Sequence, residues 1–327
     1  MHLSLARRIW KHLPAAVRES SIGVTFGRHL HGLVQRHSER RQSFGTFFLR
    51  NRAEMKLICR LLSERPQGSD LDLCFLACSK GAELYSMLWA LRSARPDLSI
   101  RVHAVDISPE ILEFAKAGVY TLPASNRPSG AGPENGLTHI ALNTWIDQNA
   151  PLFERVTTNE LEAMCDVQGG QAAIKPWLTE GITWLVGDAG TPAMIEAIGP
   201  QDIVIANRFL CHMSPDAAEG CLRNIAQLVR PGGYLFVSGV DLDVRTRVAQ
   251  QMSWEPVTEM MRELHDGDPS IRKGWPTEYW GLEPFSESRP DWKIRYASVF
   301  RIDLAATSVP DASIFVSAVS NTAVASI

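Results

Sequence analysis

Acidic side chains follow several apolar stretches of this 327-residue chain, where they are placed to recognise a ligand. The first stretch, "LDLCFLAC", leads into a turn with a single glycine, Gly81, and a single acid, Glu83. A phosphate site would require several glycines or a Lys-Ser/Thr pair, because backbone amides must close around the anion. The turn has neither feature, so we expect a ligand other than a phosphate.

Three further apolar stretches end in groups that can hydrogen-bond a nucleoside. Asp106 lies 25 residues after Gly81, a suitable distance for a carboxylate that accepts hydrogen bonds from both ribose hydroxyls. Asp188 can accept a hydrogen bond from an adenine amino group, and a fourth stretch ends at Asn207. The other expected cofactor-binding positions are the neighbouring residues Cys78, Ile107 and Ala189.

Together these groups fit S-adenosylmethionine, a nucleoside whose attached group is not a pyrophosphate. Backbone amides of the turn can meet the carboxylate of its amino-acid tail, and Glu83 can meet the ammonium or sulfonium charge. A nicotinamide dinucleotide is the competing ligand, but the sequence has no G-x-G-x-x-G turn. Each Asp alone also has a structural explanation as the N-cap of the next helix. Their order and spacing favour the cofactor.

The stretches that position these groups alternate between strand and helix patterns. We expect strands over 71–78, 100–107, 181–189, 201–210 and 232–239, and helices over 82–94, 108–120 and 214–229. This alternation predicts parallel βαβ crossovers and an α/β fold with a doubly wound, Rossmann-like sheet. The segment 291–304 is expected to add a strand or hairpin.

The remaining sequence suggests three regions. Helical patterns over 3–13, 26–37 and 47–64 predict a helical N-terminal region, residues 1–65. The catalytic domain is expected over 66–305, with an inserted Pro- and Gly-rich loop over 121–156, and 306–327 form a tail. After this loop, Thr157 and Glu160 have the spacing of a capping box that begins a short helix.

Composition favours a cytoplasmic protein that is not inserted in a membrane. The chain is 45% hydrophobic and 21% charged, and its six cysteines are scattered. There is no signal segment, and no apolar run approaches the roughly 18 to 20 residues that span a bilayer. No metal is expected, because Cys74 and Cys78 have no second pair of ligands and His29 and His31 lie on opposite sides of a helix.

The N-terminal segment is strongly basic. Residues 1–45 hold eight Arg or Lys against two Glu, a formal charge of +6, which leaves −9 for the rest of a chain of net charge −3. Such a segment attracts an acidic partner, which can be a nucleic acid, a membrane surface or an acidic protein, or it is simply a solvated helix face. Nucleic acid is disfavoured, because only Trp10, Phe26 and Phe44 are interleaved with the charges.

Five blocks of the sequence resemble, in order, those of the CheR-type methyltransferases, which methylate glutamate carboxylates of chemotaxis receptors. They are "TFFLRN" (46–51), "CSKGAELYS" (78–86), "VHAVDISPEILEFAKAGVY" (102–120), "ANRFLCHM" (206–213) and "LVRPGGYLFVS" (228–238). The resemblance covers about 44–240 and implies that Gly81, Glu83 and Asp106 hold the cofactor. It also implies that Asp188 replaces an adenine-contacting Asn and that Arg50 faces the methyl-transfer site.

Departures from the family pattern leave the methyl acceptor open. One acid and a proline are lost after Gly81, and the family's reaction-centre tyrosine is replaced by His212. A carboxylate, as in protein glutamate on an acidic partner, needs an orienting cation such as Arg50 but no general base. A small-molecule hydroxyl or amine would need a base, for which His212 is the candidate, with a pocket shaped by the 121–150 loop and tryptophans 275, 280 and 292. A non-catalytic S-adenosylmethionine-binding regulator is the third possibility.

Overall fold

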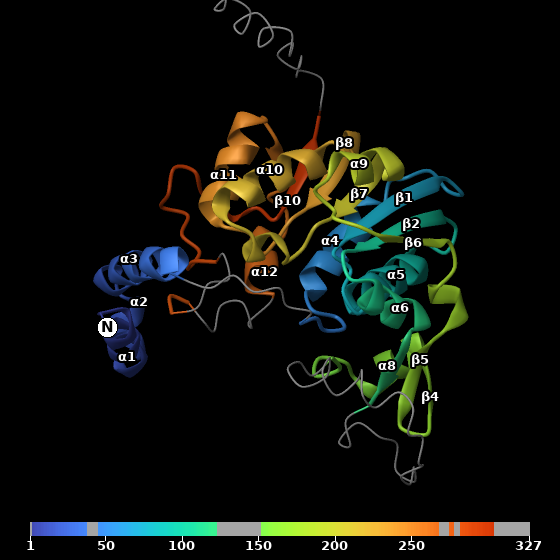
Figure 1. The fold of residues 1–327 in the computed structure, drawn as a ribbon, viewed down its shortest axis with the longest axis horizontal. Coiled ribbons are helices and arrows are strands. Elements are labelled where there is room, and N and C mark those ends of the chain that lie inside the picture. Colours follow the sequence, from blue (N-terminus) through green and yellow to red (C-terminus); the bar gives the residue numbers. More distant parts are fainter. Residues whose placement is uncertain (1, 38–44, 123–151, 268–274, 278–281, 304–327) are drawn as a thin grey trace, which may run out of the picture.

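A seven-stranded sheet forms the centre of the molecule (Figure 1). The computed structural model describes residues 2–37, 45–122, 152–267, 275–277 and 282–303. The strand order is β6-β2-β1-β7-β8-β10-β9, in which the first five strands are parallel and β10 is antiparallel to both β8 and β9. The strands are β1 (Asp70–Leu76), β2 (Ser99–Asp106), β6 (Ile182–Val186), β7 (Gln201–Ile205), β8 (Val229–Phe236), β9 (Glu255–Pro256) and β10 (Val299–Ile302).

Helices cover both faces of this sheet, because side chains of each parallel strand alternate between two apolar layers. Along β1, Leu71 and Leu73 join a core with α4 (Arg52–Leu61) and α5 (Ala82–Ala94). Cys74 and Leu76 join a second core with α10 (Pro215–Ala226) and α11 (Leu242–Gln251). The predicted doubly wound α/β class is therefore confirmed.

Several predicted helix starts coincide with observed caps. The hydroxyl of Ser108 accepts a hydrogen bond from the backbone of Ile111 at the start of α6 (Pro109–Ala117). Ser214 caps α10 in the same way. The capping box of Thr157 and Glu160 begins α8 (Thr158–Met164). The remaining helices are α9 (Pro192–Ile198), α12 (Met261–Asp266), α14 (Trp292–Tyr296) and the 3₁₀ turns η2 (Pro176–Leu178) and η3 (Leu210–His212).

The helix predicted over 108–120 is too long. α6 ends at Ala117, because Gly118 takes a left-handed conformation (φ 61°) that ends the helix. The next residues form strand β3 (Val119–Thr121), which joins β4 (Cys165–Gln168) and β5 (Gln171–Ile174) in a small antiparallel sheet, order β3-β5-β4. The sequence pattern does not predict this second sheet, because its strands are only three or four residues long.

Other predicted boundaries are also wrong. The helix predicted over 214–229 ends at Ala226, and Val229 already begins β8. The helix predicted over 47–64 begins only at Arg52, because Asn51 is its N-cap and accepts a hydrogen bond from Glu54. The strand predicted over 201–210 ends at Ile205. The segment 291–304 supplies β10 as expected, but its first half is helix α14. The patterns of 47–64 and 201–210 continue across residues at which the regular backbone starts or ends, whereas the apolar residues of 291–304 do not distinguish a short helix from a strand.

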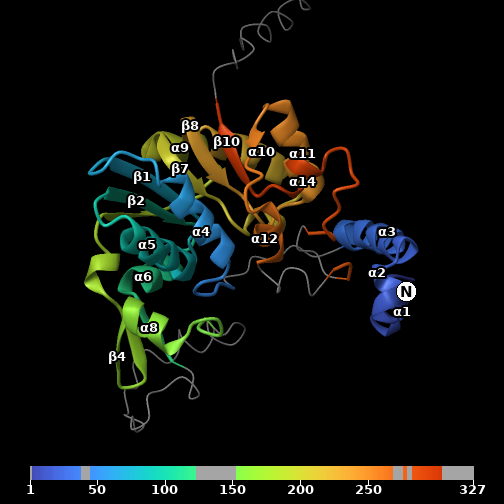
Figure 2. The ribbon, with the colours of Figure 1, turned by 180° about the vertical axis from the view of Figure 1, so that it is seen from behind.

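The N-terminal helices α1 (His2–His12), α2 (Ala15–Glu19) and α3 (Ser21–His37) lie to one side of the main body in both views (Figures 1 and 2). Trp10, Leu30 and Val34 form a small buried cluster against Trp275. By contrast, Phe48 and the buried residues of α4 belong to the main core. Residues 45–62 of the predicted N-terminal region thus pack into the main body.

Among the described helices, none is long and apolar enough to cross a membrane. The predicted 121–156 loop falls largely on residues outside the described ranges, as does the predicted tail.

Candidate functional site

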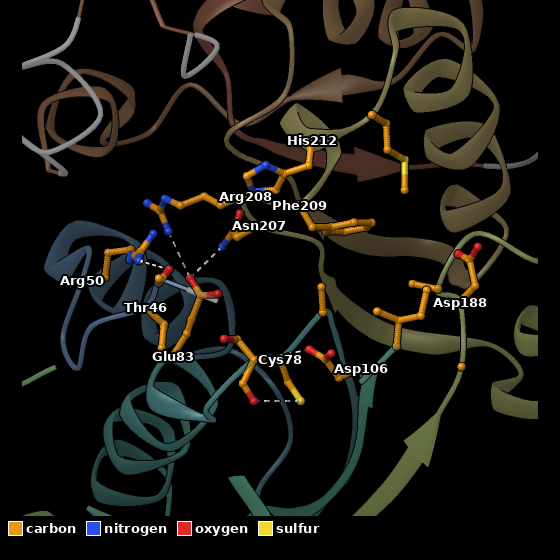
Figure 3. Close-up of a pocket in the computed structure, with 17 residues that line it drawn as sticks. Thr46, Arg50, Cys78, Glu83, Asp106, Asp188, Asn207, Arg208, Phe209 and His212 are labelled. Carbon is orange, nitrogen blue, oxygen red and sulfur yellow. Dashed lines mark hydrogen bonds and ion pairs between the residues drawn. The ribbon is translucent and has the colours of Figure 1, made fainter. Parts of the chain in front are cut away.

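A cavity lies at the carboxyl ends of β1, β2, β6 and β7 (Figure 3), where open parallel sheets bind ligands. Among the lining residues are both predicted catalytic residues and most of the predicted cofactor-binding residues: Arg50, Cys78, Glu83, Asp106, Ile107, Asp188, Ala189, Asn207 and His212. Positions scattered over 163 residues of sequence are thus brought together by the sheet. Their individual roles stay predictions.

Asp106 is a buried carboxylate fixed by backbone hydrogen bonds. Its Oδ2 accepts from the backbone N–H of Ser79 at 2.8 Å, and its Oδ1 accepts from that of Ser108 at 3.0 Å. Burial raises the pKa of Asp106, against the opposing effect of these backbone N–H groups. Each oxygen can accept further hydrogen bonds, so the carboxylate is oriented while it still has acceptor capacity.

The turn after β1 has a strained backbone. Ala77 and Ser79 both have positive φ, 53° and 51°, although neither is glycine. Such conformations cluster at ligand-binding sites, where the surrounding structure imposes them. The N–H of Ser79 is held in this conformation by Asp106, so the turn and the end of β2 fix each other.

Gly81 is not among the residues that line the cavity, and its expected close approach to the cofactor stays a prediction. It is the left-handed N-cap of α5, with φ 79°. A Cβ at this position would lie 2.9 Å from Cε2 of Tyr85 and 3.3 Å from Cβ of Ala115. The glycine therefore allows the turn to pack against α5 and α6.

Asn207 links two carboxylates at the end of β7. Its side-chain N–H₂ donates to Oε1 of Glu54 at 2.9 Å and to Oε1 of Glu83 at 3.0 Å. Its Oδ1 accepts from the backbone and the hydroxyl of Ser238, which fixes the orientation of the amide. Arg208 lies next to this network, with Nη1 3.5 Å from Oε1 of Glu83. Glu83 is thereby held at the cavity wall by an amide and a guanidinium.

Arg50 is a buried residue in the loop before α4 rather than a surface residue of that helix. Its Nη2 donates to the carbonyl of Gly45 at 2.8 Å, and its guanidinium carbon lies 4.6 Å from the ring centroid of Phe47. These contacts fix the side chain at the cavity wall, where His212 of η3 also lies.

The cavity has two ends of opposite character (Figure 3). Asp106 and Asp188 define what we call the acidic end, and Arg50, Arg208 and His212 define the basic end. Figure 3 shows Glu83 beside the basic end, in contact with Arg208. This separation suits two ligands of different charge, one bound at each end of the cavity.

The acidic end offers both polar and apolar surface. Asp188 is exposed, and its Oδ1 accepts a hydrogen bond from the backbone N–H of Gly190, while Thr191 is the N-cap of α9. Ile107, immediately after Asp106, leaves 56% of its surface exposed at the cavity although it is a large apolar residue. An exposed apolar side chain beside two carboxylates fits a nucleoside, which needs a surface for the base and acceptors for the ribose.

A doubly wound parallel sheet with acids at its strand ends and no phosphate-binding turn is the arrangement expected of a Rossmann-like domain that binds a nucleoside cofactor. A family model described as "CheR methyltransferase, SAM binding domain" matches residues 45–127. This match confirms the resemblance to the CheR-type methyltransferases and identifies the cofactor as S-adenosylmethionine.

Two relatives and one solved structure extend this comparison. "Chemotaxis protein methyltransferase 1" of Pseudomonas aeruginosa is 25% identical over 176 residues, which are 52% of this chain and 54% of that protein. The "Uncharacterized 104.1 kDa protein in hypE 3'region" of Rhodobacter capsulatus is 25% identical over 200 residues, 59% of this chain and 17% of that protein. This chain thus corresponds to only part of each relative. Magnesium protoporphyrin IX methyltransferase from Synechocystis, bound to S-adenosylmethionine, has a TM-score of 0.33 at 11% identity and covers 69% of this chain and 82% of its own.

Sequence reasoning missed several residues of the cavity. Arg208 directly follows the predicted Asn207, so the family block itself could have indicated it. Glu54 does not line the cavity but accepts a hydrogen bond from Asn207, and it gave no signal in the sequence because only the packing of α4 brings it there. Trp275 and Trp292 do not line the cavity: they pack against Trp10 and Phe285, respectively. Trp280 lies outside the described residues.

Proposed function

We propose that this protein transfers the methyl group of S-adenosylmethionine to a carboxylate, specifically a glutamate side chain of an acidic protein. The observation that carries the proposal is the basic end of the cavity, where Arg50 and Arg208 are fixed beside Glu83. Guanidinium groups present forked donors that match a carboxylate. The matched family domain and the relative named as a chemotaxis protein methyltransferase support methyl transfer, and the resemblance to the CheR-type family implies the glutamate acceptor.

The residues of the acidic end fit the cofactor. Asp106 would accept hydrogen bonds from the ribose hydroxyls, because both its oxygens are oriented and can still accept. Ile107 and Ala189 would contact the base, and Asp188 its amino group. Glu83 would meet the ammonium group, since Asn207 and Arg208 hold its carboxylate at the cavity wall.

The bound cofactor supplies an electrophilic methyl group on a sulfonium. An acceptor carboxylate is already ionised at neutral pH, because the ordinary pKa of Glu is about 4.3. Its oxygen forms the new bond to the methyl carbon as the carbon–sulfur bond breaks, and the bonding electrons stay on the sulfur. The products are a methyl ester and S-adenosylhomocysteine, and no proton is released. The task of Arg50 and Arg208 is therefore to orient the acceptor for in-line attack.

Transfer of a tritiated methyl group tests the proposal. The protein is incubated with methyl-labelled S-adenosylmethionine and glutamate-rich helical peptides, and the labelled product is then treated with alkali. A methyl ester releases volatile labelled methanol, whereas a methyl ether or a methylamine retains the label. Alkali-stable label would reject the carboxylate acceptor.

His212 at the basic end favours the second candidate, a small-molecule O- or N-methyltransferase in which it acts as base. Alkali-stable label that disappears in His212→Asn would support this candidate. Calorimetric binding of S-adenosylmethionine without turnover on either kind of acceptor would favour the non-catalytic regulator.

A further inference from the structure

The three N-terminal helices carry most of the exposed large apolar side chains. Eight such residues occur among the described residues, and five of them lie in α1, α2 and α3. The five are Leu5 (56% exposed), Ile9 (50%), Val17 (45%), Ile22 (82%) and Phe26 (43%). Exposed apolar side chains concentrated in one small region mark an interaction surface.

Phe26 stacks on Trp10 of the buried cluster. The other four side chains are separate from those that hold the helices to the main body. Leu5 and Ile9 are four residues apart on α1, and Ile22 and Phe26 are four apart on α3, so each pair lies on one helix face. The buried cluster against Trp275 uses different positions of the same helices. We call the five exposed residues the outer apolar set. Packing within the described chain leaves between 43% and 82% of each of these residues exposed.

The same helices are strongly basic. Residues 2–37 contain six Arg or Lys and one Glu, a formal charge of +5, whereas the rest of the chain carries −8. Arg8 and Lys11 are exposed next to Ile9 in the sequence of α1. Apolar residues interleaved with Arg and Lys on short surface helices are typical of segments that lie in the interface of an anionic bilayer.

We propose that α1, α2 and α3 dock this protein on an anionic lipid surface. The outer apolar set enters the interface, and the basic side chains contact the headgroups. The helices lie on the membrane and do not span it, in agreement with the absence of a spanning helix among the described residues.

The arrangement of α1, α2 and α3 favours a lipid surface over an acidic peptide as the partner of these helices. The helices project from the main body (Figures 1 and 2), and the outer apolar set is spread over all three of them. A peptide helix would need an apolar groove. A second cavity, distinct from the candidate site, lies beside α3 and is lined mainly by charged groups, including Arg28, Asp243 and Arg295. None of the outer apolar set lines it. A fluid interface adapts to a convex surface.

Vesicle flotation of the full chain tests the proposal without cofactor or acceptor, so its outcome is independent of the proposed methyl transfer. We expect the protein to float with vesicles of equimolar phosphatidylcholine and phosphatidylglycerol, and not with phosphatidylcholine alone. High salt should weaken the binding, because it screens exposed charges. Equal binding to both vesicles, or binding to neither, would overturn the proposal.

Matched variants separate the contribution of the basic residues to vesicle binding from that of the exposed apolar residues. The double variant Arg8→Glu with Lys11→Glu should weaken binding to the anionic vesicles at least about tenfold, because each basic residue near an anionic leaflet contributes appreciably. Lys56→Glu with Lys116→Glu makes the same change of charge at exposed positions of α4 and α6 and should have little effect. Ile22→Gln should weaken binding severalfold, whereas Val119→Gln, at an exposed apolar residue of β3, should not. Equal losses in a variant and its control would contradict a docking role for these helices.

Soluble poly-glutamate serves as the competing partner. The proposal fails if the wild type binds this polymer but not the vesicles and the Arg8→Glu, Lys11→Glu variant loses that binding. That result would assign the helices to an acidic protein. Circular dichroism and S-adenosylmethionine binding of each variant show that the main body remains folded.

Discussion

The acidic and basic ends of the cavity are held by different kinds of contact. Asp106 at the acidic end is fixed by two backbone N–H groups, one from each adjoining turn. At the basic end, Arg50 is fixed by a carbonyl and an aromatic ring, and Arg208 lies beside the side chains of Glu83 and Asn207. Backbone anchors depend little on which side chains surround them. At the basic end the side chain of Arg50 also has a backbone anchor, whereas that of Arg208 contacts the side chain of Glu83 and would be affected by its substitution. The acidic end is therefore suited to a constant cofactor and the basic end to a variable acceptor.

Arg50→Ala should have the largest effect and should affect the basic end alone. We expect kcat/KM for a carboxylate acceptor to fall about 10²- to 10³-fold, the loss typical of one preorganised donor. The Kd of S-adenosylmethionine should be unchanged by calorimetry. Arg50→Lys is the control: it keeps the charge but loses the forked donors, and an intermediate rate is expected. Weaker cofactor binding in Arg50→Ala would show that the two ends are not independent.

Asp106→Ala, in contrast, should weaken cofactor binding, which Arg50→Ala leaves unchanged. Loss of hydrogen bonds to a charged acceptor should weaken S-adenosylmethionine binding by about 1.5 to 3 kcal/mol. Titration calorimetry measures this difference directly. An unchanged affinity would remove Asp106 from the cofactor site.

The pH dependence of cofactor binding should sharpen the assignment of Asp106. Burial raises the pKa of this carboxyl above its ordinary value, so protonation during acidification begins at a higher pH than in an exposed Asp. Affinity for S-adenosylmethionine should fall as the pH drops through this raised pKa, because the protonated group loses acceptor capacity. For the unliganded protein the sign is opposite: the raised pKa stabilises the fold at low pH, and this contribution is lost as the pH rises through it. Asp106→Asn should abolish both dependences.

Gly239→Ala tests whether the rate of methyl transfer depends on the position of Arg208. Gly239 has φ 60°, and an added Cβ would lie 2.7 Å from Cγ and 2.8 Å from Cα of Arg208. Gly68→Ala is the matched control, since Gly68 has φ 72° but no atom within 4 Å of the added Cβ. Both variants should lose about 1 to 3 kcal/mol of unfolding free energy from backbone strain. Only Gly239→Ala should also lower kcat, by about tenfold, through displacement of Arg208. Equal rates in the two variants would remove Arg208 from the basic end's function.

His212→Asn should have the smallest effect if the acceptor is a carboxylate, because no proton has to be removed. General base catalysis contributes about 10²- to 10⁴-fold, so a loss of that size in kcat would contradict the carboxylate proposal. The rate should also show no dependence on a group with the ordinary pKa of His, near 6.5. Methyl transfer measured across pH 5 to 8 checks this point.

Much of the architecture could be predicted because local signals and tertiary packing agree. The helix over 82–94 has the predicted bounds, and caps such as Ser108 and Ser214 mark the predicted helix starts. One kind of error occurs where a single residue ends an apolar pattern, as Gly118 does for α6. Periodicity extends over such residues, whereas the backbone conformation does not.

The sequence by itself determined the order of strands and helices and the presence of acids at the strand ends, because periodicity, caps and spacing are properties of short segments. Strand ends and spacing thereby indicated seven of the residues that line the cavity, and the family resemblance indicated Arg50 and His212. Only the tertiary structure decided that Gly81 serves packing, that Arg50 is buried in the cavity wall, and that Glu54 shares Asn207 with Glu83. These contacts join segments up to 153 residues apart, and a hydrogen bond at that separation depends on how the sheet and its helices pack.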